Sequence, residues 1–444
     1  MQAFTVQIYC SSFPNIVKAK KRLRSYKQIM LSSLYRIVAK RSVSSWFHDV
    51  PLGPPDAILG LTEAYNKDTN PNKINLGAGA YRDDDGKPYI LPSVRKAEKI
   101  LFDQNLDKEY AGIAGIGKFN EAAVNLAFGD GHPVLVQRKN ATVQGVSGTG
   151  SLRIAAAFLE KFHCGPKVVW ASTPTWGNHN NIFKHSGLEM KQYRYYDKVT
   201  NGIDEAGMLD DMKRMPCGSI VLLHACAHNP TGVDPSPEQW QKISNIVKEK
   251  ELFPLFDMAY QGFATGDIDR DAFAVRLFLK NGHKLALAQS FSKNMGLYGE
   301  RVGALTFITE NEEEANRVLS QLKILIRPMI SNPPIHGARI AHFLLTDPLL
   351  RSEWLSDLKV MTGRIIKCRK TLAELLEKHG SKRQWQHIVQ QTGMFCYSGL
   401  NETQVRRLIE EFSIYLTKDG RISIAGISSK NIQYLANAIH VVTA

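Results

Sequence analysis

The first part of this 444-residue chain has no acidic residue, and Asp49 is the first one. Residues 1–45 carry nine lysines and arginines together with eight serines. A basic, serine-bearing and acid-free end is typical of a mitochondrial transit peptide. We therefore expect residues 1–45 to be a targeting leader that directs the protein to the mitochondrial matrix. A basic arm that contacts RNA or anionic lipid is the alternative.

Long apolar runs and paired cysteines are also missing. No uninterrupted apolar stretch is long enough to cross a bilayer, so no transmembrane segment is expected. The six cysteines include no CxxC pair, and a chain of this size does not depend on disulfides, which predicts reduced thiols. The net charge is +14, but the leader holds nine of these charges, which leaves +5 elsewhere. This uneven distribution argues against a nucleic-acid partner for the remainder.

Short apolar runs alternate with helical patterns through the middle of the chain, as in βα units on a parallel sheet. These runs are residues 168–170, 219–224, 252–257 and 285–288. Each run ends in polar or aromatic residues. Ligands of open α/β sheets bind at the carboxyl ends of the strands. We therefore expect an α/β fold with a mostly parallel central sheet, flanked by helices, and a ligand crevice at one edge.

The length of the chain favours more than one domain. Apolar residues recur at three- and four-residue spacing over 349–376, which predicts one long helix closed by Gly380. We expect this helix to join a large domain, residues 88–360, to a smaller α+β domain, residues 361–444. An N-terminal arm, residues 46–87, is expected to complete the smaller domain.

The stretch from Ala288 to Arg301 sets one lysine, Lys293, among hydroxyl groups directly after an expected strand. Ser290 and Ser292 can donate hydrogen bonds to phosphate oxygens, and Arg301 can bind a phosphate through two nitrogens. Lys293 can form a Schiff base with an aldehyde. This combination suggests pyridoxal phosphate as the cofactor.

A second phosphate-binding pattern lies within residues 141–158, where an expected strand, a turn of glycines and hydroxyls, and an alanine-rich helix follow one another. The free N–H groups and the positive end of the helix dipole make Ser147, Gly148 and Thr149 an anion site. An ordinary helix cap is the alternative. Because this turn carries several hydroxyl groups, we favour phosphate binding.

Two patterns typical of other chemistry are incomplete. Residues 112–118 fit the glycine skeleton of a nucleotide-binding P-loop, but Phe119 stands where the magnesium-binding hydroxyl belongs and no buried strand precedes. His224 and His228 share a strand face and are possible zinc ligands, but no further ligand cluster is evident. We expect neither a nucleotide site nor a metal.

Residues near the other expected strand ends offer contacts for the ring of the cofactor. Asp257 can pair with a protonated pyridine nitrogen, while Tyr260 and Asn229 can hydrogen-bond the phenolic oxygen. Trp176 offers a flat face for stacking. Each residue also has an ordinary structural explanation, but all four explanations would have to hold at once for the cofactor site to be absent.

Four motifs occur together and in order: Ser147-Gly148-Thr149-Gly150, residues 224–232 (HACAHNPTG), residues 257–263 (DMAYQGF) and residues 290–294 (SFSKN). With these motifs, the chain from about Trp46 to its C-terminus resembles the aspartate aminotransferase family, which is a family of fold-type I pyridoxal phosphate enzymes. The basic leader is similar to that of the mitochondrial members.

The resemblance implies a role for each matching residue at the cofactor. Lys293 would bind the cofactor covalently and move a proton between the substrate Cα and the cofactor's C4′. The phosphate would be held by Ser147, Gly148, Thr149, Ser290, Ser292 and Arg301. The ring would be positioned and tuned by Asp257, Tyr260, Asn229 and Trp176, with His179 behind Asp257.

The resemblance also implies a shared active site in a homodimer. Arg421 would bind the α-carboxylate of the substrate, with Gly79, Trp176 and Asn229 nearby. Arg327 would reach from the neighbouring subunit to the distal carboxylate, and Tyr110 would cross the same interface to the phosphate.

The implied reaction is the reversible, ping-pong transfer of an amino group from L-aspartate to 2-oxoglutarate, which gives oxaloacetate and L-glutamate. Two arginines for two carboxylates would explain a preference for dicarboxylic substrates. Ile330 departs from the family pattern, which usually has an aromatic residue there. An aminotransferase for aromatic amino acids or kynurenine is therefore the alternative.

Overall fold

The computed structural model describes residues 27, 30, 45–53, 57–77 and 79–444. The predicted leader lies outside these residues except at three positions. The chain divides into two units, Met1–Pro55 and Asp56–Ala444. In the first unit, a turn at residues 46–49 is followed by a hydrogen bond from the Val50 N–H to the Phe47 carbonyl. No helix in the described ranges has both the length and the apolar character to span a bilayer.

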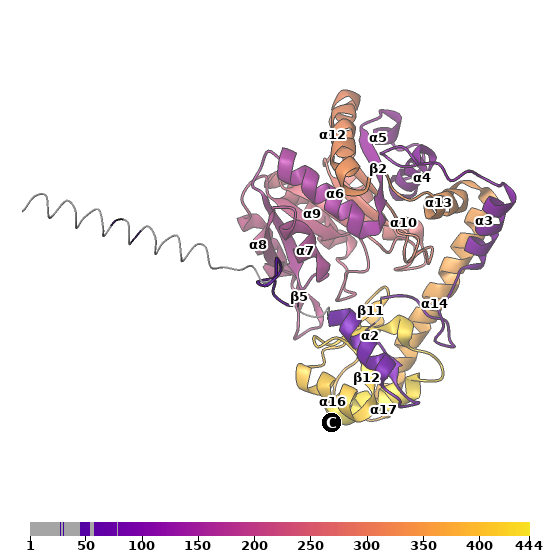
Figure 1. Ribbon diagram of the computed structural model, residues 1–444. Coiled ribbons are helices and arrows are strands. Elements are labelled where there is room, and N and C mark those ends of the chain that lie inside the picture. The colour runs from indigo at the N-terminus through magenta and orange to yellow at the C-terminus, as the bar shows by residue number, and fades with distance from the viewer. Residues whose placement is uncertain (1–26, 28–29, 31–44, 54–56, 78) are drawn as a thin grey trace, which may run out of the picture. The chain divides into compact units, whose positions relative to one another are not determined.

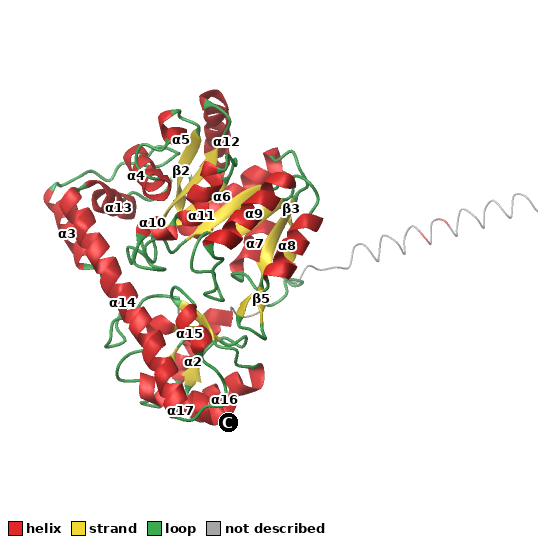
Figure 2. Ribbon diagram, turned by 180° about the vertical axis from the view of Figure 1, so that it is seen from behind, coloured by secondary structure: helices red, strands yellow, loops and turns green. Residues whose placement is uncertain are grey.

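A seven-stranded sheet lies at the centre of the second unit, in the order β2-β10-β9-β8-β7-β3-β4 (Figures 1 and 2). β10 is antiparallel to both of its neighbours, and all other pairs are parallel. The predicted mostly parallel sheet is therefore confirmed. The strands are β2 (Asn140–Val146), β3 (Val168–Thr173), β4 (Glu189–Arg194), β7 (Ile220–His224), β8 (Phe253–Met258), β9 (Ala286–Ser290) and β10 (Val302–Ile308).

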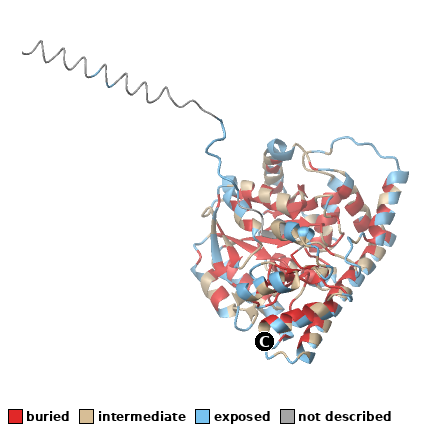
Figure 3. Ribbon diagram, turned by 60° about the horizontal axis from the view of Figure 1, so that its bottom comes forward, coloured by how far each residue is buried: buried red, intermediate tan, exposed pale blue. Residues whose placement is uncertain are grey.

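Helices cover both faces of the sheet, because its central strands are apolar on both sides. One apolar layer packs α6 (Ser147–Phe162), α7 (Asn178–Lys184) and α12 (Glu312–Ile330) against the strands. The other layer uses α4 (Gly117–Phe128), α8 (Glu205–Arg214), α9 (Pro237–Glu249) and α11 (Phe273–Lys280). Figure 3 shows buried strands in red at the centre of this unit, and β7, β9 and β10 are buried along their whole length.

The remaining elements surround this centre. The other helices are α2 (Ala57–Lys67), α3 (Pro92–Asp103), α5 (Pro133–Val136), α10 (Ile268–Asp271), α13 (His336–Thr346), α15 (Gln386–Gln390), α16 (Glu402–Phe412), α17 (Ile432–Thr443) and the 3-10 helix η1 (Ile424–Gly426). The short strands are β1 (Ile74–Asn75), β5 (Tyr196–Asp197), β6 (Gly202–Ile203), β11 (Phe395–Tyr397), β12 (Ile414–Tyr415) and β13 (Arg421–Ser423).

The predicted long helix is α14 (Pro348–Lys378), which has 31 residues. The Asp347 side chain accepts hydrogen bonds from the first free N–H groups, and Pro348 at the first position needs no acceptor. Gly380 follows the helix with φ of 74°, a conformation that glycine adopts without strain. The helix packs against α3 and α13 on one side of its length and against α15 and α17 further along.

Short strands connect residues near the start of this unit with residues near its C-terminus. β1 pairs in parallel with β12, so Ile74 lies opposite Ile414. β11 and β13 form an antiparallel pair, which brings Tyr397 opposite Arg421. Residues near position 75 therefore share one packed region with residues 395–425. The predicted boundary between 360 and 361 falls inside α14, and that division stays a prediction.

Candidate active site

A cavity of about 850 Å³, including its opening to solvent, lies at the carboxyl ends of the sheet strands. The predicted site residues line this cavity except His179, which was expected behind Asp257, and Tyr110 and Arg327. These residues are Gly79, residues at or near the ends of the sheet strands, and Arg421 on β13. Segments separated by more than three hundred residues therefore meet in one place.

Hydroxyl groups meet at the N-terminus of α6, at one end of the cavity. The Ser147 Oγ lies 2.9 Å from the Ser290 Oγ and 2.8 Å from the Ser292 Oγ. The antiparallel direction of β10 brings Arg301, just before its start, beside the ends of β2 and β9, and the Ser147 N–H donates to the Arg301 carbonyl. Any Cβ on Gly148 would lie 3.2 Å from the Ser290 Cβ. This cup of donors at a helix N-terminus suits a phosphate.

Asp257 lies at the end of β8, where it is almost fully buried. The His179 Nε2 lies 3.1 Å from its Oδ2, and the Thr175 hydroxyl is 2.8 Å from the other ring nitrogen of His179. Burial by itself would raise the pKa of Asp257, but the hydrogen bond from His179 and the neighbouring charges hold that pKa below its usual value. A carboxylate that is charged at neutral pH is therefore available to a cationic ring nitrogen.

The Lys293 amine lines the same cavity as this carboxylate and the hydroxyl cup. It lies 5.5 Å from the centre of the Tyr260 ring and makes no hydrogen bond within residues 57–77 and 79–444. Burial lowers the pKa of Lys293, and the nearby Arg301 lowers it further, while Asp257 opposes them. A larger share of neutral amine follows, and the neutral amine is the nucleophile.

Arg421 forms the opposite wall of the cavity, with only 5% of its surface exposed. Its Nη2 donates to the Gly77 carbonyl at 3.1 Å, and the guanidinium lies 4.2 Å from the centre of the Phe395 ring. Its buried Nε has no hydrogen-bond partner among the described residues. An unsatisfied donor in a buried cation is costly, and a bound carboxylate would satisfy it.

The two histidines of the possible zinc pattern are occupied by hydroxyl groups. The His228 ring nitrogens lie 2.8 Å from Ser172 and 2.8 Å from Thr231. His224 lies 3.2 Å from the Thr175 hydroxyl, and burial lowers its pKa to about 3. In the described ranges, no group of three or more His, Cys, Asp or Glu side chains is placed to hold a metal ion.

Tyr110 and Arg327, which do not line the cavity, are both on the surface of the chain. Tyr110 is 86% exposed in the loop after α3. Arg327 is exposed near the end of α12, where it donates to the Ser331 hydroxyl. The structure of one chain therefore does not bring either residue to the other site residues.

Tyr298 and Phe395 line the cavity, and sequence reasoning assigned neither of them to the site. Tyr298 accepts hydrogen bonds at two places: its hydroxyl accepts from the Tyr81 N–H at 2.9 Å, and its carbonyl accepts from the Arg301 guanidinium. Phe395 supports the Arg421 guanidinium from the short strand β11. Tyr298 lies inside the lysine stretch but matches no phosphate or ring pattern, and no sequence signal marks Phe395.

Comparison with known proteins supplies the family. The pattern described as "Aminotransferase class I and II" matches residues 71–439. The chain belongs to this family. This protein is 58% identical over 400 residues to the mitochondrial aspartate aminotransferase of Xenopus tropicalis, covering 90% of this chain and 94% of the relative.

Solved structures of aminotransferases have the same fold. An aromatic-amino-acid aminotransferase from Burkholderia pseudomallei, covalently bound to pyridoxal phosphate, is 45% identical with a TM-score of 0.88, covering 90% of this chain and all of that one. A mitochondrial aspartate aminotransferase from Trypanosoma brucei is 42% identical with a TM-score of 0.84, covering 87% of this chain and all of that one. The predicted fold and family are thus confirmed.

Proposed function

We propose that this aminotransferase transfers the amino group of L-aspartate to 2-oxoglutarate, reversibly and by a ping-pong route, and so forms oxaloacetate and L-glutamate. The observation that carries the proposal is one cavity that holds a charged carboxylate, a hydroxyl cup and a buried amine, Lys293, which has no hydrogen bond within the described residues. Arg421 adds a binding group for a carboxylate in the same cavity.

Pyridoxal phosphate is the cofactor that these residues fit. The cup of Ser147, Ser290 and Ser292 with Arg301 would hold the phosphate, together with Gly148 and Thr149. The ring would lie against Trp176, with Asp257 at its nitrogen and with Tyr260 and Asn229 at its phenolic oxygen. When bound, the cofactor supplies an aldehyde and a protonated ring that withdraws electrons from the substrate Cα.

Lys293 performs two tasks in this proposal. Its amine would hold the cofactor covalently, and its Nζ would carry the proton between the substrate Cα and the cofactor's C4′. Burial keeps water away and favours the neutral amine that accepts this proton. His179 acts on Asp257 alone, because its hydrogen bond keeps the carboxylate charged and fixed in position.

The substrate is held at both carboxylates. Arg421 binds the α-carboxylate, with Gly79, Trp176 and Asn229 around it, and it is already oriented by the Gly77 carbonyl and the Phe395 ring. Arg327 of a second copy binds the distal carboxylate, and Tyr110 of that copy reaches the phosphate. The exposure of both residues within one chain supports this homodimer with shared sites.

The chain is mitochondrial, in keeping with its relatives and its acid-free leader, and we place it in the matrix. The proposed division is a leader of residues 1–45, an arm of residues 46–87, a large domain of residues 88–360 and a small domain of residues 361–444. The pairing of β1 with β12 supports the assignment of the arm to the small domain.

An aminotransferase for aromatic amino acids or kynurenine is the second candidate. The similarity to the Burkholderia pseudomallei aromatic-amino-acid enzyme favours it, as does Ile330, which lies three residues from Arg327. Comparison of phenylalanine with aspartate as amino donors separates the two candidates. A larger kcat/KM for phenylalanine would replace the first proposal with the second.

The absorbance spectrum of the purified protein tests the cofactor and the donor together. We expect a visible band that shifts when aspartate is added. Borohydride reduction followed by digestion should then give one labelled peptide that contains Lys293. A colourless protein, or a label on any other residue, would contradict the proposed function.

A further inference from the structure

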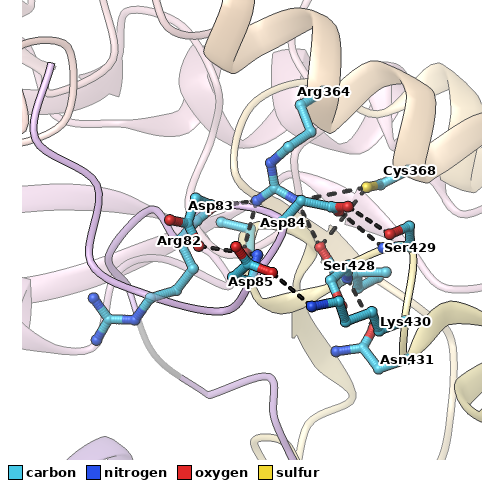
Figure 4. A network of polar contacts seen from close by, with 12 residues as sticks. Arg82, Asp83, Asp84, Asp85, Arg364, Cys368, Ser428, Ser429, Lys430 and Asn431 are labelled. Atoms are coloured by element: carbon cyan, nitrogen blue, oxygen red, sulfur yellow. Dashed lines mark hydrogen bonds and ion pairs between the residues drawn. The ribbon is translucent and has the colours of Figure 1, made fainter. Parts of the chain in front are cut away.

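Arg364, on α14, binds two chain segments that lead out of the proposed substrate site (Figure 4). The first is residues 81–85, which follow Gly79. The second is residues 425–431, which follow Arg421 on β13. These two segments are more than 300 residues apart in sequence, and the Arg364 guanidinium lies between them with its side chain 16% exposed.

All three guanidinium nitrogens of Arg364 donate hydrogen bonds. On the first segment, Nε donates to the Tyr81 hydroxyl at 2.9 Å, and Nη2 donates to the Arg82 carbonyl. On the second segment, Nη1 donates to the Ile427 carbonyl at 2.7 Å, and Nη2 donates to the Ala425 carbonyl at 3.1 Å. The planar group therefore crosslinks both backbones, which an ammonium group cannot do in the same geometry.

A weaker outer ring of contacts joins the same two segments. Asp84 accepts from the Ser429 N–H at 2.9 Å, and Lys430 lies 2.6 Å from Asp85. The Asp85–Lys430 pair is exposed, and exposed pairs contribute little free energy. Arg364 is only partly neutralised, because the nearest Asp84 oxygen is 4.0 Å from it. Its role is thus to bind backbone carbonyls rather than to form a salt bridge.

The crosslink is continuous with the cavity wall on both sides. Gly79 lines the cavity two residues before Tyr81, and the Tyr81 N–H donates to the hydroxyl of Tyr298, which also lines the cavity. Arg421 lines the cavity four residues before Ala425. Any displacement of the crosslinked segments would therefore change the position of the Arg421 guanidinium relative to Gly79.

We propose that Arg364 is a positioning residue. It binds both the segment after Gly79 and the segment after Arg421, fixes their relative position, and so sets the affinity of Arg421 for the substrate α-carboxylate. The proposal rests on the proposed function, since it assumes that Arg421 binds this carboxylate. Arg364 itself does not line the cavity, so it acts through the two segments. Because every amino acid and oxo acid substrate has an α-carboxylate, all of them depend on it equally.

Kinetics of the holoenzyme with Arg364→Met test this role. We expect the KM values for aspartate, alanine and 2-oxoglutarate to rise by similar factors of about tenfold or more, because small misplacements of binding groups are costly. We expect kcat to change by less than about threefold and the visible band to stay in place, since the phosphate cup and the ring contacts remain. Calorimetry with succinate, a dicarboxylate without an amino group, should show the same loss of affinity.

Three further variants separate positioning from general stability. Arg364→Lys should have an intermediate loss, and Tyr81→Phe should raise KM by only about two- to threefold, because it removes one of four acceptors. Arg351→Met is the matched control: it lies on the same helix, and in the described ranges its side chain makes no hydrogen bond. It should keep both KM and succinate affinity.

The proposal is wrong if Arg364→Lys and Tyr81→Phe keep the succinate affinity of the unmodified enzyme, whatever their melting temperatures. A fall in kcat with unchanged KM would also overturn it. If Arg364→Met fails to fold, Arg364→Lys and Tyr81→Phe decide the question alone. Failure of the proposed function looks different, because the unmodified protein would then show no aspartate-dependent change in its visible spectrum.

Discussion

Arg421 and Arg327 are the two arginines proposed to bind the substrate, and the chain places them in opposite environments. Arg421 is buried in the cavity wall, supported by Phe395 and the Gly77 carbonyl. Arg327 is exposed near the end of α12, outside the cavity, and contacts Ser331 one turn away. In the proposed function, one chain therefore supplies the group that binds the α-carboxylate, and a neighbouring chain supplies the group that binds the distal carboxylate.

The difference has an energetic basis. Burial of a guanidinium costs free energy unless its donors are satisfied, and the buried Nε of Arg421 has no partner among the described residues. Burial also lowers the pKa of Arg421. In the proposed function, this unsatisfied donor would favour the binding of any α-carboxylate. The exposed Arg327 has no such cost before assembly, so selectivity for a second carboxylate would arise only in the dimer.

The largest expected effect comes from replacing Lys293. It tests whether the chemical step is independent of carboxylate binding by the two arginines. Lys293→Ala should lower kcat by a factor of roughly 10⁵ or more, because the covalent link and the proton carrier are lost together. Succinate affinity, measured by calorimetry, should stay close to that of the unmodified enzyme, since both arginines remain. A parallel loss of succinate affinity would show that the lysine also belongs to the carboxylate grip.

A mixed dimer tests whether Arg327 serves the neighbouring site. One chain carries Arg421→Ala and the other carries Arg327→Ala, with different tags for purification. If the sites are shared, one site of the hybrid has both arginines intact, and the hybrid should recover about half of the unmodified activity. Each parent homodimer should be far less active.

The alternative outcome of this experiment is equally clear. If each chain uses its own Arg327, every site in the hybrid lacks one arginine and no activity returns. That result would contradict the proposal that Arg421 acts in the site of its own chain while Arg327 acts in the site of the neighbouring chain.

Substrate length distinguishes the two arginines within one assay. Arg421→Lys should lower kcat/KM by about 10- to 100-fold for both aspartate and alanine, because it removes a charge-assisted pair made through two nitrogens. Arg327→Lys should have a similar effect on aspartate and almost none on alanine, which has no distal carboxylate. Equal losses for alanine in the two variants would contradict the assignment of Arg327.

The smallest expected effect is a loss of stability in acid. It arises from Asp257, which lies in the part of the site that a single chain forms. The folded-state pKa of Asp257 lies below its usual value, so the charged form favours the folded state. This stabilisation is complete above the unfolded pKa and is lost as the pH falls through the lower folded value. As the pH falls below about 4, the cofactor-free protein should therefore lose more stability in urea than Asp257→Asn does. An identical loss would show that His179 does not stabilise the charged Asp257.

Sequence reasoning identified the functional side chains of the site more completely than the strand directions and contacts that position them. The strand before Lys293 and the glycine turn at Ser147 were predicted because apolar runs, glycines and hydroxyls signal their local structure directly. The reversed direction of β10 was not predicted, although it brings Arg301 to the cup. Strand direction depends on long-range packing, which a local pattern does not contain.

The Arg364 crosslink was missed for a related reason. Its acceptors are mostly backbone carbonyls, which every residue has, so no side-chain pattern marks them. The Asp257–His179 pair was inferred from the family resemblance, and the structure shows the contact at 3.1 Å. The roles assigned to Arg327 and Tyr110 stay predictions, because they need a second copy of the chain.

The pairing of β1 with β12 has a consequence for the order in which the molecule is completed. Ile74 finds its neighbour only at Ile414, so the edge that carries Gly79 has no strand to lie on until nearly the last residues are available. When a chain emerges amino end first, from a ribosome or across a membrane, the residues of its hydroxyl cup and Lys293 become available well before Arg421 and the other residues proposed to bind the α-carboxylate. Assembly would therefore proceed from the cofactor end toward the substrate end, and a chain cut before position 414 would stop between the two.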